Sequence, residues 1–283
     1  MILTGKARIA GVMGWPVSHS RSPLIHGMWL AQYGIDGAYI PMAVRPENLA
    51  GALRALPVLG FSGCNLTLPH KEAALSLMDR LDTTARRIGA VNTVVVAEDG
   101  SLEGRNTDAL GFIEHLRQAQ PGYRAPSGAA IVLGAGGAAR AVLAALLDAG
   151  VPEIRLVNRN AGRAEALAAA LGGAIRVIDW NRRGSALSDT ALLVNATNLG
   201  MIGMGPLEID LNALPQNTIV YDIVYTPLET PLLKAARARG NKVVDGLGML
   251  LHQARPGFAA WFGVEPEVTP ELRASVEATL PMP

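Results

Sequence analysis

The sequence is short of cysteine, of aromatic residues and of net charge. Its 283 residues include a single cysteine, Cys64, so an intrachain disulfide and a multi-cysteine metal site are both excluded. Lysine and arginine together number 25 against 24 aspartates and glutamates, and the net charge is only +1. That balance lacks the basic character of nucleic-acid-binding proteins. We therefore expect small molecules, rather than nucleic acid, as partners.

Long apolar segments are also missing. The N-terminal residues contain no apolar stretch long enough for a secretory signal. Apolar windows such as Ala141–Leu147 fall far short of the ~20 residues that cross a bilayer. We expect a cytoplasmic protein that binds no membrane.

Aliphatic residues, by contrast, are abundant. Hydrophobic side chains make up 49% of the chain and aromatic ones only 5%, so its cores must be mostly aliphatic. Such a composition favours helices packed on buried parallel sheets. At roughly 150 residues per domain, the length indicates two domains.

Strand-like and helix-like segments alternate along the chain, which is typical of an α/β fold with parallel sheets. In the first part we expect strands at 8–13, 38–44 and 61–66, helices at 23–33, 46–56 and 69–78, and a hairpin of strands 91–97 and 101–103 around Asp99-Gly100. A helix at 108–119 and a polar loop at 120–128 follow. In the second part we expect strands at 130–133, 154–157, 174–178, 192–195, 219–222 and 242–244, and helices at 138–149, 163–171, 247–262 and 270–280.

One glycine-rich turn has the context of a dinucleotide-binding motif. The apolar run Ala130–Leu133 leads directly into Gly134-Ala135-Gly136-Gly137-Ala138-Ala139, where a helix begins. Gly134 permits a tight turn, Gly136 lets the backbone approach a pyrophosphate, and Ala139 allows close packing of helix on strand. The free N–H groups of the helix would face the phosphates. A glycine-rich turn without a ligand is the alternative.

The end of the second strand of this half indicates which dinucleotide binds. An NAD site has an acidic residue there, about 20 residues beyond the glycines. This chain instead has Asn158-Arg159-Asn160, with Arg163 close behind. Two guanidinium groups can bind a 2′-phosphate bidentately, which favours NADP. The alternative is that both arginines are merely solvated.

Four polar segments fall at the ends of elements in the first half. They are Gly14–Pro23, Asn65–Lys71, Gly89–Thr93 and Gly104–Asp108. Each has an ordinary explanation of its own: Ser22 before Pro23 fits a helix N-cap, and Asp108 fits the first turn of a helix. Lys71 is harder to explain, because the start of a helix is an unfavourable place for a cation.

Taken together, the motifs resemble the shikimate dehydrogenase family over essentially the whole chain. The matching stretches, in order, are Ser18-His19-Ser20-Arg21-Ser22-Pro23, Asn65-x-Thr67-x-Pro69-x-Lys71, Gly89-Ala90-x-Asn92-Thr93, Asn106-Thr107-Asp108, Gly134–Ala138, Asn195-Ala196-Thr197, Asp222-x-x-Tyr225-x-Pro227 and Asp245–Leu250 with Gln253-Ala254. Eight motifs in the same order make the match specific. Relatives often have Thr where this chain has Asn160, and Asn where it has Gly27.

The resemblance implies an enzyme that reversibly reduces 3-dehydroshikimate to shikimate with NADPH, in aromatic amino acid biosynthesis. Lys71 and Asp108 would form the catalytic pair. Other residues would bind the substrate carboxylate and ring hydroxyls together with that pair, namely Ser20, Ser22, Thr67, Asn92, Tyr225 and Gln253. The chemistry is reasonable, because a carbonyl that accepts hydride becomes an alkoxide and needs a proton donor or a cation nearby.

The resemblance also implies a two-domain fold. Residues 1–107 with 246–283 would form an α/β substrate domain with a mostly parallel sheet, onto which the C-terminal helices return, and residues 108–245 a Rossmann-like NADP domain. NADP contacts would fall at Gly134, Ala135, Gly136, Gly137, Ala138, Asn158, Arg159, Asn160, Arg163, Thr197, Ile223 and Gly246. The sequence leaves open whether the protein is a homodimer.

Three rival functions remain. A quinate/shikimate dehydrogenase or another paralogue on the same scaffold would differ in a few pocket residues. A silent NADP-binding regulator would bind cofactor without turnover, although Lys71 and Asp108 argue against it. A methylene-tetrahydrofolate dehydrogenase would need different substrate motifs. The five histidines show no metal-ligand spacing with neighbouring acids, so we expect no metal.

Overall fold

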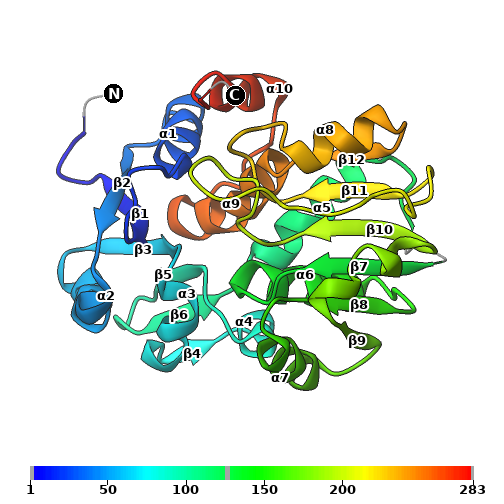
Figure 1. Cartoon of the computed structure of the whole chain (residues 1–283). Helices are drawn as coiled ribbons and strands as arrows, with labels where there is room; N and C mark the ends of the chain where they lie inside the picture. Colours follow the sequence, from blue (N-terminus) through cyan, green and yellow to red (C-terminus); the bar gives the residue numbers. More distant parts are fainter. Residues whose placement is uncertain (1–2, 125–127, 282–283) are drawn as a thin grey trace. The chain divides into compact units, whose positions relative to one another are not determined.

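The computed structural model describes residues 3–124 and 128–281, and it divides into two compact units (Figure 1). Unit 1 consists of Met1–Asp108 with Leu251–Val276, and unit 2 of Ala109–Leu250 with Glu277–Pro283. Part of the loop expected at 120–128 lies outside the described residues. No helix in the described ranges is both long enough and apolar enough to cross a membrane.

Unit 1 is built on a six-stranded sheet with the order β2-β1-β3-β5-β6-β4 (Figure 1). Its elements are β1 (Arg8–Gly14), α1 (Ser22–Gln32), β2 (Gly37–Ala43), the 3₁₀ turn η1 (Pro46–Asn48), α2 (Leu49–Val58), β3 (Phe61–Leu66), α3 (His70–Ala73), η2 (Ala74–Leu77), β4 (Arg80–Leu81), α4 (Thr83–Ile88), β5 (Thr93–Val96) and β6 (Leu102–Arg105). Three of its strand pairings are parallel, and the two that involve β5 are antiparallel.

The reversal at β5 places three polar segments at one edge of the sheet. Strand β3 ends there, β5 begins there, and β6 returns to end there, because a hairpin turns the chain around between β5 and β6. Gly100 makes that turn with a φ of 79°, a conformation that suits glycine. The residues that follow β3, precede β5 and follow β6 are therefore neighbours in space although they are far apart in sequence.

Unit 2 is built on a six-stranded, wholly parallel sheet with the order β12-β11-β10-β7-β8-β9 (Figure 1). Its elements are α5 (Asp108–Ala119), β7 (Ala129–Leu133), α6 (Gly137–Asp148), β8 (Ile154–Val157), α7 (Ala161–Leu171), β9 (Ile175–Ile178), η3 (Trp180–Arg182), η4 (Ser185–Leu187), β10 (Thr190–Asn195), β11 (Ile219–Asp222), α8 (Pro231–Ala238) and β12 (Lys242–Val244). From β9 to β12 this is the order 3-2-1-4-5-6 of a Rossmann fold, as expected.

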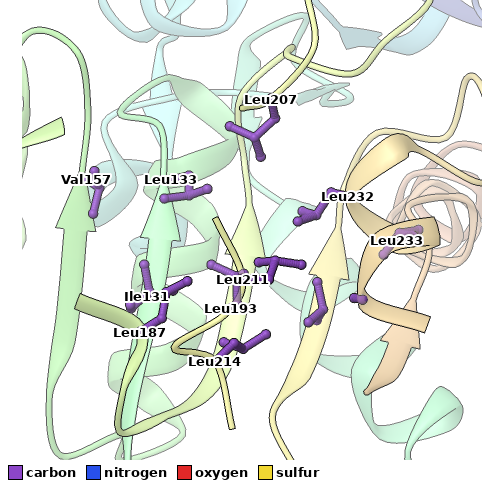
Figure 2. Packing of buried hydrophobic residues seen from close by; sticks show 12 residues of the cluster. Ile131, Leu133, Val157, Leu187, Leu193, Leu207, Leu211, Leu214, Leu232 and Leu233 are labelled. Atoms are coloured by element: carbon purple, nitrogen blue, oxygen red, sulfur yellow. The ribbon is translucent and has the colours of Figure 1, made fainter. Parts of the chain in front are cut away.

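One hydrophobic cluster of unit 2 consists of aliphatic side chains. Figure 2 shows side chains of β7, β10, α8 and the segments between them pointing toward one another. Every residue labelled there is valine, isoleucine or leucine, and each is at most 7% exposed. The scarcity of aromatic residues in the sequence is thus reflected in this cluster.

The last two helices, α9 (Leu247–Phe262) and α10 (Pro270–Glu277), carry the chain back to unit 1. Trp261 of α9 is 2% exposed, and its indole Nε1 donates to the carbonyl of Val94 in β5 at 3.0 Å. Gly63 of β3 makes room for this ring, because a Cβ there would lie 2.3 Å from the indole nitrogen. The expected return of the C-terminal helices to the first domain is confirmed.

Most expected elements are present, and the differences have local causes. The helix expected at 69–78 is one α turn, α3, continued by the tighter turn η2. Helix α4 was not expected, although Asp82 caps it by accepting from the amide of Ala85, and Gly89 ends it with a φ of 72°. Ser22 is not an N-cap: Arg21 occupies that position, and α1 begins at Ser22.

Candidate active site

In unit 1 the structure brings Lys71 and Asp108 together. Lys71 lies in the single turn α3, and Asp108 comes directly after the segment that follows β6. The Lys71 Nζ donates to Asp108 Oδ2 at 2.6 Å, with the two side chains 18% and 7% exposed. A short, largely buried ammonium–carboxylate contact of this kind holds both groups in one orientation.

Asn92 fixes the other oxygen of the same carboxylate. Its Nδ2 donates to Asp108 Oδ1 at 2.8 Å and to Thr107 Oγ1 at 2.9 Å, and lies 3.2 Å from Gln253 Oε1. Its Oδ1 accepts from the amide of Thr107 at 2.9 Å and from the hydroxyl of Thr93 at 2.9 Å. Asn92 is 1% exposed and is hydrogen-bonded through both ends of its amide. It is the centre of a set of hydrogen-bonded side chains that we call the polar network, which consists of Lys71, Asn92, Thr93, Thr107, Asp108 and Gln253.

The polar network extends to helix α9 and to strand β3. The hydroxyl of Thr107 donates to the backbone carbonyl of Gln253 at 2.8 Å, which ties α9 to the segment after β6. Asn65, at the end of β3, donates to the carbonyl of Asn92 and to Thr93 Oγ1, both at 3.1 Å. These bonds leave the Asn65 Oδ1 to accept from the phenol of Tyr39 at 2.6 Å.

The two serines of the first loop lie at the far end of this chain of contacts. Ser20 Oγ accepts from the amide of Ser22 at 3.3 Å, and the hydroxyl of Ser22 is hydrogen-bonded to Tyr39. Burial raises the pKa of Tyr39 well above its usual value, so its hydroxyl stays protonated. Thr67 lies just beyond β3, where its amide donates to the carbonyl of Met13 at 2.9 Å.

Tyr225 is the one expected substrate contact that lies in unit 2, in the loop after β11. That loop is anchored by Asp222, which is 0% exposed. Asp222 accepts from Asn195 Nδ2 at 2.9 Å, from the amide of Val224 at 3.0 Å and from Thr230 Oγ1 at 2.7 Å. Burial nevertheless raises its pKa from 3.8 to about 6.

The glycine-rich turn of unit 2 has the geometry that its sequence predicts. Gly134 has a φ of 108°, and a Cβ there would lie 2.8 Å from the carbonyl oxygen of Ala196. A Cβ on Gly136 would meet nothing within 4 Å, so open space lies in front of the amino end of α6. Gly136 is the N-cap and offers no side chain to the first amides of α6. Gly137 and Ala138 begin that helix, and Ala135 completes the turn.

Two other expected cofactor contacts lie against each other. A Cβ on Gly246 would lie 2.2 Å from the carbonyl oxygen of Ile223, so this approach requires glycine. Thr197 is held by Asn195, whose Oδ1 accepts from the amide of Thr197 at 3.1 Å and from its hydroxyl at 2.7 Å.

The polar residues after β8 differ in what they do. Asn158 Nδ2 donates to the carbonyl of Asn160 at 2.9 Å. Asn160 is the N-cap of α7, and its Oδ1 accepts from the amide of Arg163 at 2.9 Å. A capping role explains why either asparagine or threonine suits this position. Arg159 and Arg163 are both exposed.

The open turn and the exposed arginines fit a phosphorylated dinucleotide. The space in front of Gly136 and the uncapped amides of α6 suit a pyrophosphate, and the guanidinium groups after β8 suit a further phosphate. Within the described residues, no group of three or more His, Cys, Asp or Glu side chains could hold a metal ion.

Comparison with known proteins agrees with this geometry. The chain matches the family model of the shikimate dehydrogenase substrate binding domain over residues 12–94, and that of shikimate / quinate 5-dehydrogenase over residues 119–223. A curated relative from Paramagnetospirillum magneticum, named shikimate dehydrogenase (NADP(+)), is 64% identical over 274 residues, which cover 97% of this chain and 99% of the relative. The chain belongs to the shikimate dehydrogenase family.

Solved structures place this member of the shikimate dehydrogenase family among enzymes of more than one specificity. A shikimate 5-dehydrogenase from Thermus thermophilus, in complex with NADP(H) and shikimate, is 39% identical with a TM-score of 0.85, over 96% of this chain and 98% of the other. A quinate dehydrogenase from Corynebacterium glutamicum, in complex with NAD, is 33% identical with a TM-score of 0.89, over 96% and 99%. Side chains, rather than the fold, must therefore select substrate and cofactor.

The sequence points to some members of the polar network less clearly than to others. Tyr39 is predicted only as part of a strand, and Thr107 only as part of a motif. The alternation of Asn65 and Thr67 at the end of β3 does indicate a ligand site, because open α/β sheets bind ligands beyond the carboxyl ends of their strands. Nothing in the sequence around Tyr39 pointed to Asn65.

Proposed function

We propose that this protein is an NADP-dependent shikimate dehydrogenase, which reversibly reduces 3-dehydroshikimate to shikimate in aromatic amino acid biosynthesis. The observation that carries the proposal is the 2.6 Å contact between Lys71 Nζ and Asp108 Oδ2, held in place by Asn92. The relative named shikimate dehydrogenase (NADP(+)) at 64% identity supports the same substrate and cofactor.

The substrate end of the proposal rests on unit 1. Ser20 and Ser22 would bind the carboxylate, and Thr67, Asn92, Asp108 and Gln253 the ring hydroxyls, with Tyr225 contributing from unit 2. Hydroxyls both donate and accept, so a layer of amides, hydroxyls and one carboxylate matches a polyhydroxylated ring. The substrate domain would comprise residues 1–107 and 246–283, in keeping with the substrate-binding family model at residues 12–94.

Lys71 would manage the proton in the proposed reaction. NADPH, when bound, supplies the hydride that the substrate carbonyl accepts. The Lys71 ammonium donates a proton to the oxygen that becomes the hydroxyl, and Asp108 orients that ammonium and balances its charge. In the oxidative direction the neutral amine of Lys71 accepts the proton of the substrate hydroxyl, so that Lys71 is the general base instead of the general acid.

The cofactor end rests on unit 2, and the NADP domain would comprise residues 108–245. The turn Gly134–Ala138 would hold the pyrophosphate against α6. Asn158, Arg159, Asn160 and Arg163 would bind the phosphorylated ribose, and Thr197, Ile223 and Gly246 would complete the site. The open space at Gly136 and the exposed arginines support this assignment. For the compartment we propose the cytoplasm, since a chain with Cys64 as its single cysteine lacks the disulfide framework common in secreted proteins.

The decisive experiment measures initial rates with shikimate and with quinate, each with NADP and with NAD. We expect strong activity only for shikimate with NADP. Comparable rates with quinate or NAD would assign the protein to the dual-specificity relatives. Tight NADP binding without any turnover would indicate a silent regulator and would contradict the proposal.

A further inference from the structure

Trp180 stands beside Arg159 because of the register between β8 and β9. The two strands pair in parallel, with Val157 opposite Ile178. Arg159 and Trp180 each come two residues later, so they leave the same edge of the sheet on neighbouring strands. The guanidinium carbon of Arg159 lies 6.0 Å from the centre of the indole, at the outer limit of a cation–π contact.

The indole itself is held in place on several sides. Trp180 packs against the aliphatic core of unit 2, and the guanidinium of Arg183 lies 4.6 Å from its ring centre. Arg183 is anchored in turn, because it donates to the carbonyls of Glu208 and Trp180, each at 2.8 Å. Asp179 caps the short turn η3 by accepting from the amide of Asn181 at 2.8 Å. Trp180 is therefore a fixed surface rather than a mobile one.

Arg159, in contrast, is exposed and keeps its hydrogen-bond donors available. Across residues 3–124 and 128–281 its guanidinium has no carboxylate or carbonyl partner, and the contact with Trp180 is the one interaction the structure records for it. An arginine of this kind must give up rotamer freedom when it binds an anion. A fixed indole that already restricts the guanidinium reduces that loss.

We propose that Trp180 is a positioning residue that strengthens the preference for a 2′-phosphorylated cofactor, by holding the Arg159 guanidinium where it can bind the phosphate. The inference rests on the proposed cofactor site and adds a residue to it that no motif contains. Trp180 acts through Arg159, so its removal weakens recognition of the phosphate and leaves recognition of the rest of the nucleotide unchanged.

The test is calorimetric titration of the full-length protein with 2′,5′-ADP and with 5′-AMP, which differ in the 2′-phosphate alone. Trp180→Leu removes the aromatic face, and we expect it to weaken 2′,5′-ADP binding roughly two- to fivefold, the range of an exposed cation–π contact. Binding of 5′-AMP should not change. Trp180→Phe keeps a weaker aromatic face and should give an intermediate loss, and it carries the test if the leucine variant folds poorly.

Two arginine variants test whether Trp180 acts by orienting Arg159 or whether any positive charge near Trp180 has the same effect. Arg159→Ala should weaken 2′,5′-ADP binding about tenfold, as expected for a lost charged hydrogen bond. Arg182→Ala removes the same charge from an exposed neighbour of Trp180 and should have little effect. In the Arg159→Ala background, Trp180→Leu should cause no further loss, because the two residues act on the phosphate as one unit.

The outcomes distinguish this inference from the proposed function. Equal weakening of both ligands by Trp180→Leu, or an undiminished effect in the Arg159→Ala background, would overturn the inference and leave the NADP assignment standing. If Arg159→Ala weakened 2′,5′-ADP binding while Trp180→Leu and Trp180→Phe bound it normally, the inference would also be overturned and the NADP assignment would stand. A wild-type protein that binds 2′,5′-ADP no better than 5′-AMP would overturn both.

Discussion

The two candidate sites, one in each unit, are built in opposite ways. The polar network of unit 1 is buried: Asn92, Asp108 and Gln253 are 1%, 5% and 8% exposed, and they are bonded to protein partners. The candidate phosphate site of unit 2 consists of exposed arginines and an uncapped helix start. The hydroxyls of a ring substrate need donors and acceptors at fixed positions, whereas a phosphate needs available positive charge. The first must be preorganised inside the fold, and the second is assembled at the surface.

The largest effect on activity should come from a substitution in the buried polar network of unit 1. Lys71→Ala is expected to lower kcat by roughly 10²–10⁴, the usual range for loss of a general acid–base group. Lys6→Ala, at an exposed lysine in the same unit, is the matched control and should leave kcat unchanged. A folded Lys71→Ala variant with near-normal turnover would remove the basis of the proposed mechanism.

Asp222 is a fully buried carboxyl group of unit 2, and it offers a pH test of stability. The pKa of Asp222 is raised from 3.8 to about 6, so the folded state binds a proton more tightly than the unfolded state. Between about pH 4 and pH 6 the free energy of unfolding should therefore fall as the pH rises, by about 3 kcal/mol in total at 1.36 kcal/mol per pKa unit. Below pH 4 and above pH 6, Asp222 should cause no further change in the free energy of unfolding with pH.

Urea denaturation across that pH range measures the effect, with Asp222→Asn as the comparison, because asparagine keeps the shape and cannot ionise. The variant should lose the downward slope. Asp79→Asn is a control of opposite sign, since hydrogen bonding from Arg54 lowers the pKa of Asp79 and its contribution is lost as the pH falls. A wild-type slope retained by Asp222→Asn would show that another group titrates.

Removing the centre of the polar network should destabilise unit 1. Asn92→Ala leaves an Asp108 oxygen and the amide of Thr107 buried without their partners, and we expect a loss of about 2 kcal/mol in the free energy of unfolding. Asn48→Ala is the control, because that exposed side chain makes no capping hydrogen bond. Equal stability of the two variants in urea would mean that water replaces the network without cost.

Substitution of the exposed arginines of unit 2 should change the cofactor specificity of the enzyme rather than the stability of its fold. Neutral replacement of Arg159 and Arg163 together is expected to raise the KM for NADP roughly 10- to 30-fold, with little change for NAD, because charged hydrogen bonds to the phosphate are lost. The melting temperature should stay within a few degrees of the wild type. Equal losses for both cofactors would contradict the assignment of these arginines to the 2′-phosphate.

Local patterns predicted much of the fold. Strands β3, β8, β11 and β12 and helices α5 and α9 have the expected bounds, because each is a continuous apolar or periodic run between turn residues. Helix α4 was missed because its two turns are too short for a clear period, although its capping residues were readable. The hairpin around Asp99-Gly100 was predicted from two residues, since φ above zero at Gly100 is a local requirement.

The candidate site was predictable as a set of motifs and not as a geometry. The pairing of Lys71 with Asp108 was expected from the family resemblance, and the structure shows the contact. The link from Tyr39 to Asn65 and the neighbourhood of Arg159 and Trp180 were not expected. Both depend on strand pairing between segments more than 20 residues apart, and no local pattern carries that information.

By itself, the sequence determined the class of the fold, the glycine turn and the residue types that a hydroxylated substrate and a phosphorylated cofactor require. These follow from composition, local conformation and side-chain chemistry. The tertiary structure alone decided which of those residues touch. Strand order and register bring the segments after β3 and β6 together with the segment before β5, and they set Trp180 beside Arg159. Register is a property of paired strands, so it exists only once the sheet has formed.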